Sequence, residues 1–285
     1  APGRRAGARR PGAPWHSPRG GWGVRLLFIG DVVGRAGRRM LRDHLESLIE
    51  QHGIELTVVN GENAAGGWGL TPETADELFA AGADVITLGN HWADRKEILP
   101  YLERNPRVLR PLNWPGEPPG QGAVVAEGRS GCRVAVLCLM GRVFADSLLD
   151  DPFVAADRAL TGLAGQAAAI LVDVHGDATS EKQALAWYLD GRVSAVVGTH
   201  THTPTADERV LPGGTAAITD VGMTGPRDSI IGFEPDGVIR RLRTQLHVRL
   251  EVARGPRVLC GVIVDVDRDT GKATAIERIR VEDPG

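Results

Sequence analysis

The sequence VRLLFI at residues 24–29 is a short apolar run that stops at Gly30-Asp31. An apolar run of this length bounded by a turn is typical of a buried β-strand. Apolar residues then recur at helical spacing over positions 41–49, and Gly53 supplies a stop signal. A second strand is predicted at residues 54–59. The chain therefore begins as a strand, a helix and a second strand.

The same alternation continues along the chain. Thr71-Pro72 has the form of a helix start, with threonine as the cap and proline in the first turn, and Gly82 ends that helix. Further strands are predicted at 84–88, 168–174 and 193–197, and further helices at 94–104 and 180–190. Strands that alternate with helices favour a parallel sheet with helices packed on its faces.

The middle and the tail of the chain are less regular. Residues 111–122 hold four prolines and three glycines and are predicted to form a loop. Around them we expect strands at 123–127 and 132–139 and a helix at 154–165. Beyond about residue 205 we expect short β runs, including 246–252 and 258–266, with a hairpin-type turn at 269–271. No linker divides the chain, so residues 24–285 are predicted to form a single domain.

The first 23 residues have a different composition. They contain five arginines, no acidic residue and many Gly, Pro and Ala residues, which predicts a disordered basic leader. It lacks the apolar centre of a secretory signal, and a start assigned too early would explain it. A basic arm for nucleic acid is the alternative. Without these five charges the net charge of −3 becomes −8 for residues 24–285.

Composition narrows the classes of function. Apolar residues make up 42% of the chain, but no run reaches the ~18–20 residues of a membrane span. An acidic folded part gives no reason to expect membrane attachment or stable nucleic-acid binding. Cys132, Cys138 and Cys260 are too few and too scattered for a disulfide framework, and we expect them to be small buried residues. These features favour a cytoplasmic protein.

Five polar clusters follow five of the predicted strands. They are Gly30-Asp31, Asn60-Gly61-Glu62-Asn63, Gly89-Asn90-His91, Asp173-Val174-His175 and Gly198-Thr199-His200-Thr201-His202. Ligands of open parallel sheets bind at the carboxyl ends of the strands. These side chains are therefore expected to converge on one crevice.

His200 and His202 are the most suggestive pair. In an extended segment residues i and i+2 point the same way, about 6.5–7 Å apart. That spacing suits two metal ions about 3.5–4 Å apart with one imidazole on each. Two histidines hydrogen-bonded in a loop are the structural alternative.

The other clusters supply oxygen ligands. Glu62 has two oxygens and can bridge two ions, Asp31 adds a second carboxylate, and Asn90 offers a neutral oxygen. An oxygen and nitrogen set without thiolates favours iron, manganese or zinc. Taken singly, Asp31 or Glu62 also fits a helix cap. In the same way, Asn63 fits a turn and His91 a hydrogen-bonded histidine near the sheet end.

Two further stretches have mainly structural interpretations. The glycine-rich segment 64–70 (AAGGWGL) lacks the lysine and spacing of a phosphate-binding P-loop, and we interpret it as a flexible wall beside the metals. Trp68 is expected to pack on its own domain rather than to stack on a base. Residues 179–182 (TSEK) form a helix start, with Thr179 or Ser180 as the cap.

Several of these motifs together resemble a known family. Gly89-Asn90-His91 and residues 198–202 (GTHTH) resemble signatures of calcineurin-like metallophosphoesterases. Residues 28–34 (FIGDVVG), 60–67 (NGENAAGG) and 179–182 extend the resemblance to the bacterial YmdB-like branch, from about Val24 to near the C-terminus.

The resemblance implies a layered αββα sandwich with a dinuclear metal site at the carboxyl ends of the strands. It implies a phosphodiesterase that acts on 2′,3′-cyclic nucleotides and that is often a homo-oligomer. One metal would be held by Asp31, Glu62, Asn63 and His202. The other would be held by Glu62, Asn90, His175 and His200, so Glu62 would bridge. Attack would come from a metal-held hydroxide, with His91 as the proton donor.

The chain departs from the wider pattern at two places. Val33 stands where the superfamily has a histidine, so Asn63 is expected to complete the first metal's ligands. Gly176-Asp177 stands where the branch commonly has Ala-Glu, beside His175, which is expected to change the surroundings of that ligand. The alternatives to a phosphodiesterase are a metal-binding regulatory or interaction protein with little turnover, and a dimetal hydrolase of another bond such as an amide.

Overall fold

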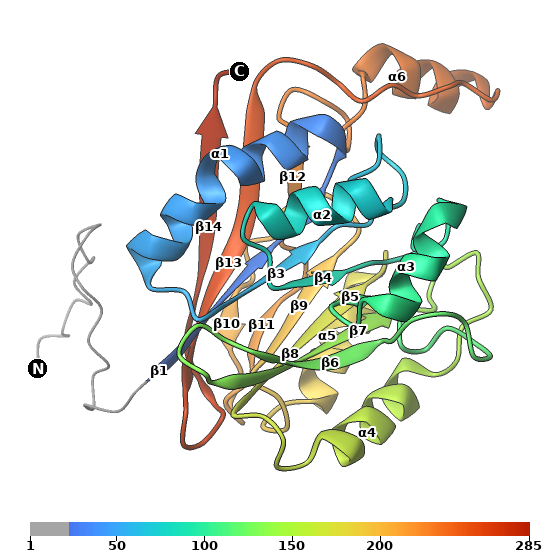
Figure 1. Ribbon diagram of the computed structural model, residues 1–285. Helices are drawn as coiled ribbons and strands as arrows, with labels where there is room; N and C mark the ends of the chain where they lie inside the picture. Colours follow the sequence, from blue (N-terminus) through green and yellow to red (C-terminus); the bar gives the residue numbers. More distant parts are fainter. Residues whose placement is uncertain (1–22) are drawn as a thin grey trace, which may run out of the picture.

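The structure is a computed structural model that describes residues 23–285. The expected leader, residues 1–23, therefore lies outside the described residues except for Gly23, which is the first residue of a strand. Two β-sheets form the centre of the fold, and helices cover their outer faces (Figure 1).

The first sheet contains the strand that opens the fold. Its order is β2-β12-β13-β1-β3-β4-β5, with β14 paired to β13. The strands are β1 (Gly23–Ile29), β2 (Asp31–Val32), β3 (Leu56–Asn60), β4 (Val85–Thr87), β5 (Val108–Leu109), β12 (Met223–Pro226), β13 (Arg257–Asp267) and β14 (Ala273–Asp283). Strands β1, β3, β4 and β5 are parallel, whereas β13 is antiparallel to β1.

The second sheet is formed by the later alternating segments. Its order is β10-β11-β9-β8-β7-β6. The strands are β6 (Ala123–Glu127), β7 (Arg133–Met140), β8 (Ala169–His175), β9 (Ala195–Thr199), β10 (Arg209–Val210) and β11 (Ala216–Ile218). The four strands β7, β8, β9 and β11 are parallel, and β6 and β10 are antiparallel edge strands. The predicted parallel arrangement is thus confirmed for the centre of each sheet, but both sheets are mixed.

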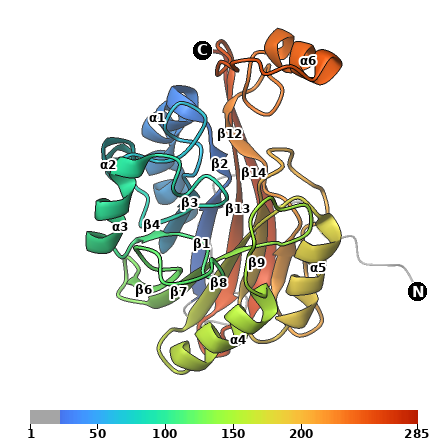
Figure 2. The ribbon, with the colours of Figure 1, turned by 90° about the vertical axis from the view of Figure 1, so that its right-hand side faces the viewer.

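The helices form the two outer layers, as Figure 2 shows. The helices α1 (Gly34–His52), α2 (Pro72–Ala80) and α3 (Leu99–Arg104) lie on the side of the first sheet. The helices α4 (Pro152–Leu163) and α5 (Thr179–Tyr188) lie on the side of the second. Helix α6 (Pro235–Thr244) projects from one end of the molecule. The described chain is therefore layered as helices, sheet, sheet and helices.

Strand β1 shows why residues 24–29 are apolar almost throughout. Leu26 and Phe28 pack in the cluster between the two sheets, together with Val58 and Val136. Leu27 and Ile29 point the other way and pack against helix α1. A strand that is buried on both faces needs apolar residues at successive positions, not at alternate ones.

Several local predictions are confirmed. Thr71 caps α2 and forms a capping box with Thr74, with Pro72 in the first turn. Residues 111–122 form the predicted loop, apart from one bridge at Gln121. The three cysteines are free and buried. Among the described helices, none combines the length and the apolar character needed to cross a bilayer.

Other local predictions are wrong. Residues 246–252 form no strand, because they lie mostly exposed beside α6 and only Val252 makes a bridge. Helix α6 was not predicted, since only Val238 of this arginine-rich helix is buried. Neither Thr179 nor Ser180 caps α5, whose N-cap residue is Ala178. The predicted helix 94–104 is shorter and is divided into a 3₁₀ turn, η1 (Lys96–Ile98), and α3.

Candidate metal centre

The polar clusters converge at the carboxyl ends of both sheets. Asp31 follows β1, Glu62 and Asn63 follow β3, Asn90 and His91 follow β4, His175 ends β8, and His200 and His202 follow β9. The first three groups come from the first sheet and the last two from the second. The site therefore lies where the carboxyl ends of the strands in the two sheets meet, as expected for parallel strands.

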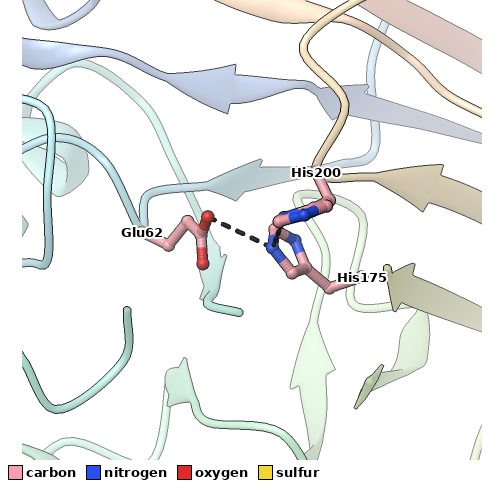
Figure 3. A group of neighbouring side chains, drawn as sticks. All are labelled: Glu62, His175 and His200. Carbon is pink, nitrogen blue, oxygen red and sulfur yellow. Dashed lines mark hydrogen bonds and ion pairs between the residues drawn. The ribbon is translucent and has the colours of Figure 1, made fainter. Parts of the chain in front are cut away.

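Two groups of ligand atoms share one carboxylate. Glu62, His175 and His200 form one group, and Asp31, Glu62 and His202 form the other, with the ligand atoms of each group within 4.8 Å of one another. In the first group His175 Nε2 lies 3.1 Å from Glu62 Oε1 and 2.9 Å from His200 Nδ1 (Figure 3). Both groups consist of oxygen and nitrogen atoms only, which suits iron, manganese or zinc.

The second group contains a buried oxygen with no hydrogen-bond partner. Asp31 is fully buried, and its Oδ1 atom makes no hydrogen bond within the described residues. This atom lies 3.8 Å from His202 Nε2. An unpaired buried carboxylate oxygen is costly, so a cation at this position would satisfy a group that the protein leaves unmatched.

Two asparagine side chains complete the cluster. Asn90 Oδ1 lies 3.0 Å from His175 Nε2, so this oxygen faces the first group, as a metal ligand should. Asn63 presents its amide nitrogen instead, 3.0 Å from Glu62 Oε1 and 3.1 Å from His202 Nε2. Rotation of this amide by 180° would offer its oxygen to a cation.

Each imidazole is held by a second partner on its other nitrogen. His175 Nδ1 lies 2.9 Å from Thr199 Oγ1, and His202 Nδ1 donates to the Ile231 carbonyl at 2.9 Å. His200 Nε2 lies 3.4 Å from Asp177 Oδ1. Such outer partners fix the ring orientation of metal-binding histidines. The expected effect of Asp177 on His175 is therefore wrong, because Asp177 faces His200.

Asp173 belongs to one of the predicted polar clusters, but the sequence analysis assigned it no role of its own. Its carboxylate is buried and accepts hydrogen bonds from Thr199 Oγ1 at 2.7 Å and Thr87 Oγ1 at 2.6 Å. Because the Thr199 hydroxyl donates to Asp173, its oxygen accepts the proton of His175 Nδ1. This leaves His175 Nε2 without a proton in the neutral ring and available as a ligand. The sequence feature that could have indicated this role is the position of Asp173 two residues before His175, on the same face of β8.

The loop of His200 and His202 is not extended as we predicted. His200 has a φ of 101° and His202 a φ of 63°, both in the left-handed region. The two rings nevertheless enter different ligand groups. The prediction that each histidine serves a separate position is thus consistent with the geometry, but the extended backbone on which it rested is wrong.

The buried charges shift one another's pKa values. Burial disfavours the charged form of Glu62, but the charge and hydrogen bond of His175, together with His91 and His200, outweigh this and hold the pKa of Glu62 at about 2. Burial also disfavours the imidazolium of His175, yet the Glu62 carboxylate raises the pKa of His175 to about 9. Burial and the charge of His175 lower the pKa of His200 to about 4, and burial raises the pKa of Asp173 to about 6. Burial likewise raises the pKa of Asp31.

His91 lies beside the first group but is oriented by a partner outside it. Its backbone N–H donates to Glu62 Oε2 at 3.3 Å, and its Nδ1 atom lies 2.7 Å from Asp94 Oδ2. The ring is partly exposed. This position, at the edge of the cluster and open to solvent, suits a proton donor better than a ligand.

The glycine-rich wall is held at several points. The Arg95 side chain donates to the Trp68 and Ala65 carbonyls at 3.1 and 2.9 Å. Trp68 stacks on Phe233 with ring centroids 4.7 Å apart, which confirms that it packs on its own domain. These tethers differ from the flexible wall that the glycine content predicted.

Comparisons with known proteins agree on one family. The family model described as YmdB-like protein matches residues 27–279. A 2′,3′-cyclic-nucleotide 2′-phosphodiesterase of Bacillus subtilis is 49% identical over 260 residues, which cover 91% of this chain and 98% of that protein. A putative phosphatase/phosphodiesterase of Mycoplasma genitalium is 34% identical, covering 90% and 93%.

Two solved structures are also similar. A hypothetical protein from Thermus thermophilus has a TM-score of 0.85 at 43% identity, covering 92% of this chain and all of that one. A structure described as a novel phosphatase of Mycoplasma pneumoniae has a TM-score of 0.86 at 34% identity, covering 92% and 94%. The similarity therefore extends over nearly the whole described chain.

Gly89 leaves no room for a side chain in the ligand cluster. A Cβ atom at this position would collide with the Glu62 carboxylate and the His175 ring. We expect Gly89→Ala to weaken manganese binding by at least about tenfold, because both ligands must shift. Isothermal titration of metal-free protein checks this. Gly162→Ala is the matched control, since a Cβ there meets no atom within 4 Å. Equal affinity of Gly89→Ala and the wild type would contradict the assignment.

Metal binding should release a proton from His175. With a pKa raised to about 9, His175 of the metal-free protein is protonated at pH 7, whereas a ligand must be neutral. Affinity should therefore rise with pH below about 9, by about tenfold per pH unit for one proton between pH 6 and 8. Titrations in two buffers with different ionisation enthalpies measure the protons released. Release of none over this range would show that His175 is not a ligand.

Proposed function

Because the chain belongs to the YmdB-like protein family, we propose that it is a metal-dependent phosphodiesterase that hydrolyses 2′,3′-cyclic nucleotides. The observation that carries the proposal is Glu62, a buried carboxylate shared by two groups of metal ligands. Glu62 would help to hold two cations, and a pair of cations would stabilise the attacking and the leaving oxygen of a phosphoryl displacement. The name of the Bacillus subtilis relative supports the substrate class.

The proposed ligand sets follow the two groups. Asp31, Glu62, Asn63 and His202 would hold one ion, and Glu62, Asn90, His175 and His200 the other. Iron or manganese is favoured, with zinc as the third candidate, because the donors are carboxylate, amide and imidazole. The four layers of helices and sheets support a calcineurin-like αββα sandwich.

When bound, the two ions supply a nucleophile at neutral pH and offset the charge on the phosphate. The protein's own groups do the remaining work. Glu62 stays ionised, with a pKa of about 2, so it can hold both cations over the whole physiological range. The Asp173–Thr199 chain keeps the ring of His175 in the tautomer that ligation needs.

His91 is the proposed proton donor. Asp94 accepts the proton of His91 Nδ1, which leaves Nε2 to carry the proton that is transferred. As the bond from phosphorus to the departing ribose oxygen breaks, that oxygen takes the proton from Nε2. Asp94 orients the ring through its contact with Nδ1. Its role is therefore that of a positioning residue.

The proposal extends to the molecule as a whole. Residues 24–285 act as one domain whose partner is a small phosphodiester. Free, buried cysteines fit a cytoplasmic protein, because thiols persist in a reducing compartment. Exposed apolar side chains on and after α6, at Ile239, Leu242 and Leu246, fit a homo-oligomer.

A metal and substrate panel tests the function directly. Metal-free protein reconstituted with manganese or iron should hydrolyse 2′,3′-cyclic AMP and bis-p-nitrophenyl phosphate, a diester, faster than p-nitrophenyl phosphate, a monoester. Metal content is measured on the same sample. A metal-replete protein that hydrolyses neither diester would instead favour a metal-binding regulatory or interaction protein.

Single substitutions separate proton donation from metal binding. We expect His91→Ala to lower the turnover number by about 10²–10⁴-fold and to keep the bound metal. Asp31→Ala and His200→Ala should lose metal, because each removes a ligand. His247→Ala, on an exposed segment after α6, is the control and should match the wild type. Full activity in His91→Ala would remove its assigned role, and unchanged metal content would remove Asp31 or His200 from the ligand set.

A further inference from the structure

The Thr179–Lys182 motif contains a buried lysine that the proposed reaction does not use. Lys182 lies in the first turn of α5, and only 3% of its surface is exposed. Its Nζ atom donates to the Thr199 carbonyl at 2.9 Å and to Asp220 Oδ2 at 3.0 Å. Asp220 is also buried. An ion pair this deep in a protein requires an explanation, since both charges have lost their water.

The Lys182–Asp220 pair forms hydrogen bonds with main-chain groups on both sides of His200. Lys182 binds the carbonyl of Thr199, the residue before it, and Asp220 Oδ2 accepts the N–H of Thr201, the residue after it, at 3.1 Å. Asp220 Oδ1 also accepts the Gly222 N–H at 2.9 Å, which fixes the carboxylate itself. Lys182 and Asp220 thus act on the loop through its main chain.

The gripped loop has a conformation that ordinary residues avoid. His200 and His202 both have positive φ angles, and such angles persist only where the surroundings determine the backbone. These are the two histidines that enter separate ligand groups. A loop that relaxed to negative φ would carry both rings away from the carboxylates.

A role in stability alone is a weak explanation for this pair. Buried ion pairs are often replaceable by apolar residues without loss of stability, because desolvation offsets their attraction. An apolar pair could not donate a hydrogen bond to the Thr199 carbonyl or accept one from the Thr201 N–H. The main-chain contacts therefore point to geometry as the function of the pair.

We propose that Lys182 and Asp220 are a positioning pair that holds the 199–202 backbone so that His200 and His202 reach different metal ions. The inference rests on the proposed metal centre. It gives the lysine of the Thr179–Lys182 motif a function beyond that of a helix start. Loss of the pair should weaken metal binding at a distance, through the loop, without removing a ligand.

The test compares metal affinity with stability. Lys182→Met keeps the length of the side chain and removes its charge. We expect manganese to bind this variant about 10–100-fold more weakly in isothermal titration, the effect typical of an outer partner of a ligand. In the metal-free variant, hydrogen exchange of the peptide spanning residues 199–204 should be faster than in the wild type.

A second ion pair provides the control. Arg25 and Asp265 approach to 2.6 Å at the opposite end of β1, with side chains 13% and 14% exposed. Arg25→Met should lower the melting temperature yet leave the manganese affinity and the exchange of residues 199–204 unchanged. A drop in affinity as large as that of Lys182→Met would show that general destabilisation suffices, and would overturn the inference.

Two further variants keep the test decisive if Lys182→Met is poorly folded. Asp220→Asn retains the size of the side chain, and Lys182→Met with Asp220→Leu replaces the whole pair by apolar groups. Both variants should bind manganese more weakly than the wild type. For the double variant this holds even when its melting temperature equals that of the wild type. Wild-type manganese affinity in either variant would overturn the inference about the pair but not the proposed metal centre. A wild type that binds no manganese, iron or zinc would overturn the proposed centre and the inference with it.

Discussion

One buried carboxylate joins the two sheets at the point where the candidate ligands meet. Asp173, on β8 of the second sheet, accepts hydrogen bonds from Thr87 and Asn60, which belong to the first sheet. It also accepts one from Thr199, the hydroxyl that faces His175. Apolar packing between the sheets would tolerate small slips, but these directional bonds do not. The convergence of the candidate ligands from five strands depends on this fixed register between the sheets.

The polar cluster is surrounded by apolar clusters, and its groups form hydrogen bonds and ion pairs with one another. The Asp173 bonds, the Lys182–Asp220 pair and the outer partners of the three imidazoles leave few buried polar atoms of the cluster unmatched. Asp31 Oδ1 is the exception among the proposed ligands. Networks of this kind specify one arrangement strongly but add little net stability, since each buried charge must be desolvated. The surrounding apolar clusters must therefore supply the stability that the centre does not.

Sequence reasoning brought these residues together because its signals are local. Apolar runs mark the strands, and the residues just after them lie at one edge of a parallel sheet, so Asp31, Glu62 and His175 could be placed together. The same reasoning missed features that depend on tertiary contacts. The left-handed backbone at His200 needs Lys182 and Asp220 from elsewhere in the chain, and no pattern in residues 198–202 shows them. Helix α6 was missed because few of its residues are apolar and only Val238 is buried.

The segment before α6 contacts the ligand cluster and its wall within three residues. The carbonyl of Ile231 holds the ring of His202, and Phe233 lies stacked under Trp68 of the glycine-rich loop. Helix α6 begins two residues later, at Pro235, and projects away from the body (Figure 2). The segment that leads into α6 therefore also contacts the candidate metal centre. Phe233 and Val252 flank this projecting part and form a bridge with each other, so a shortened version would have to preserve that bridge, which lies beside Trp68.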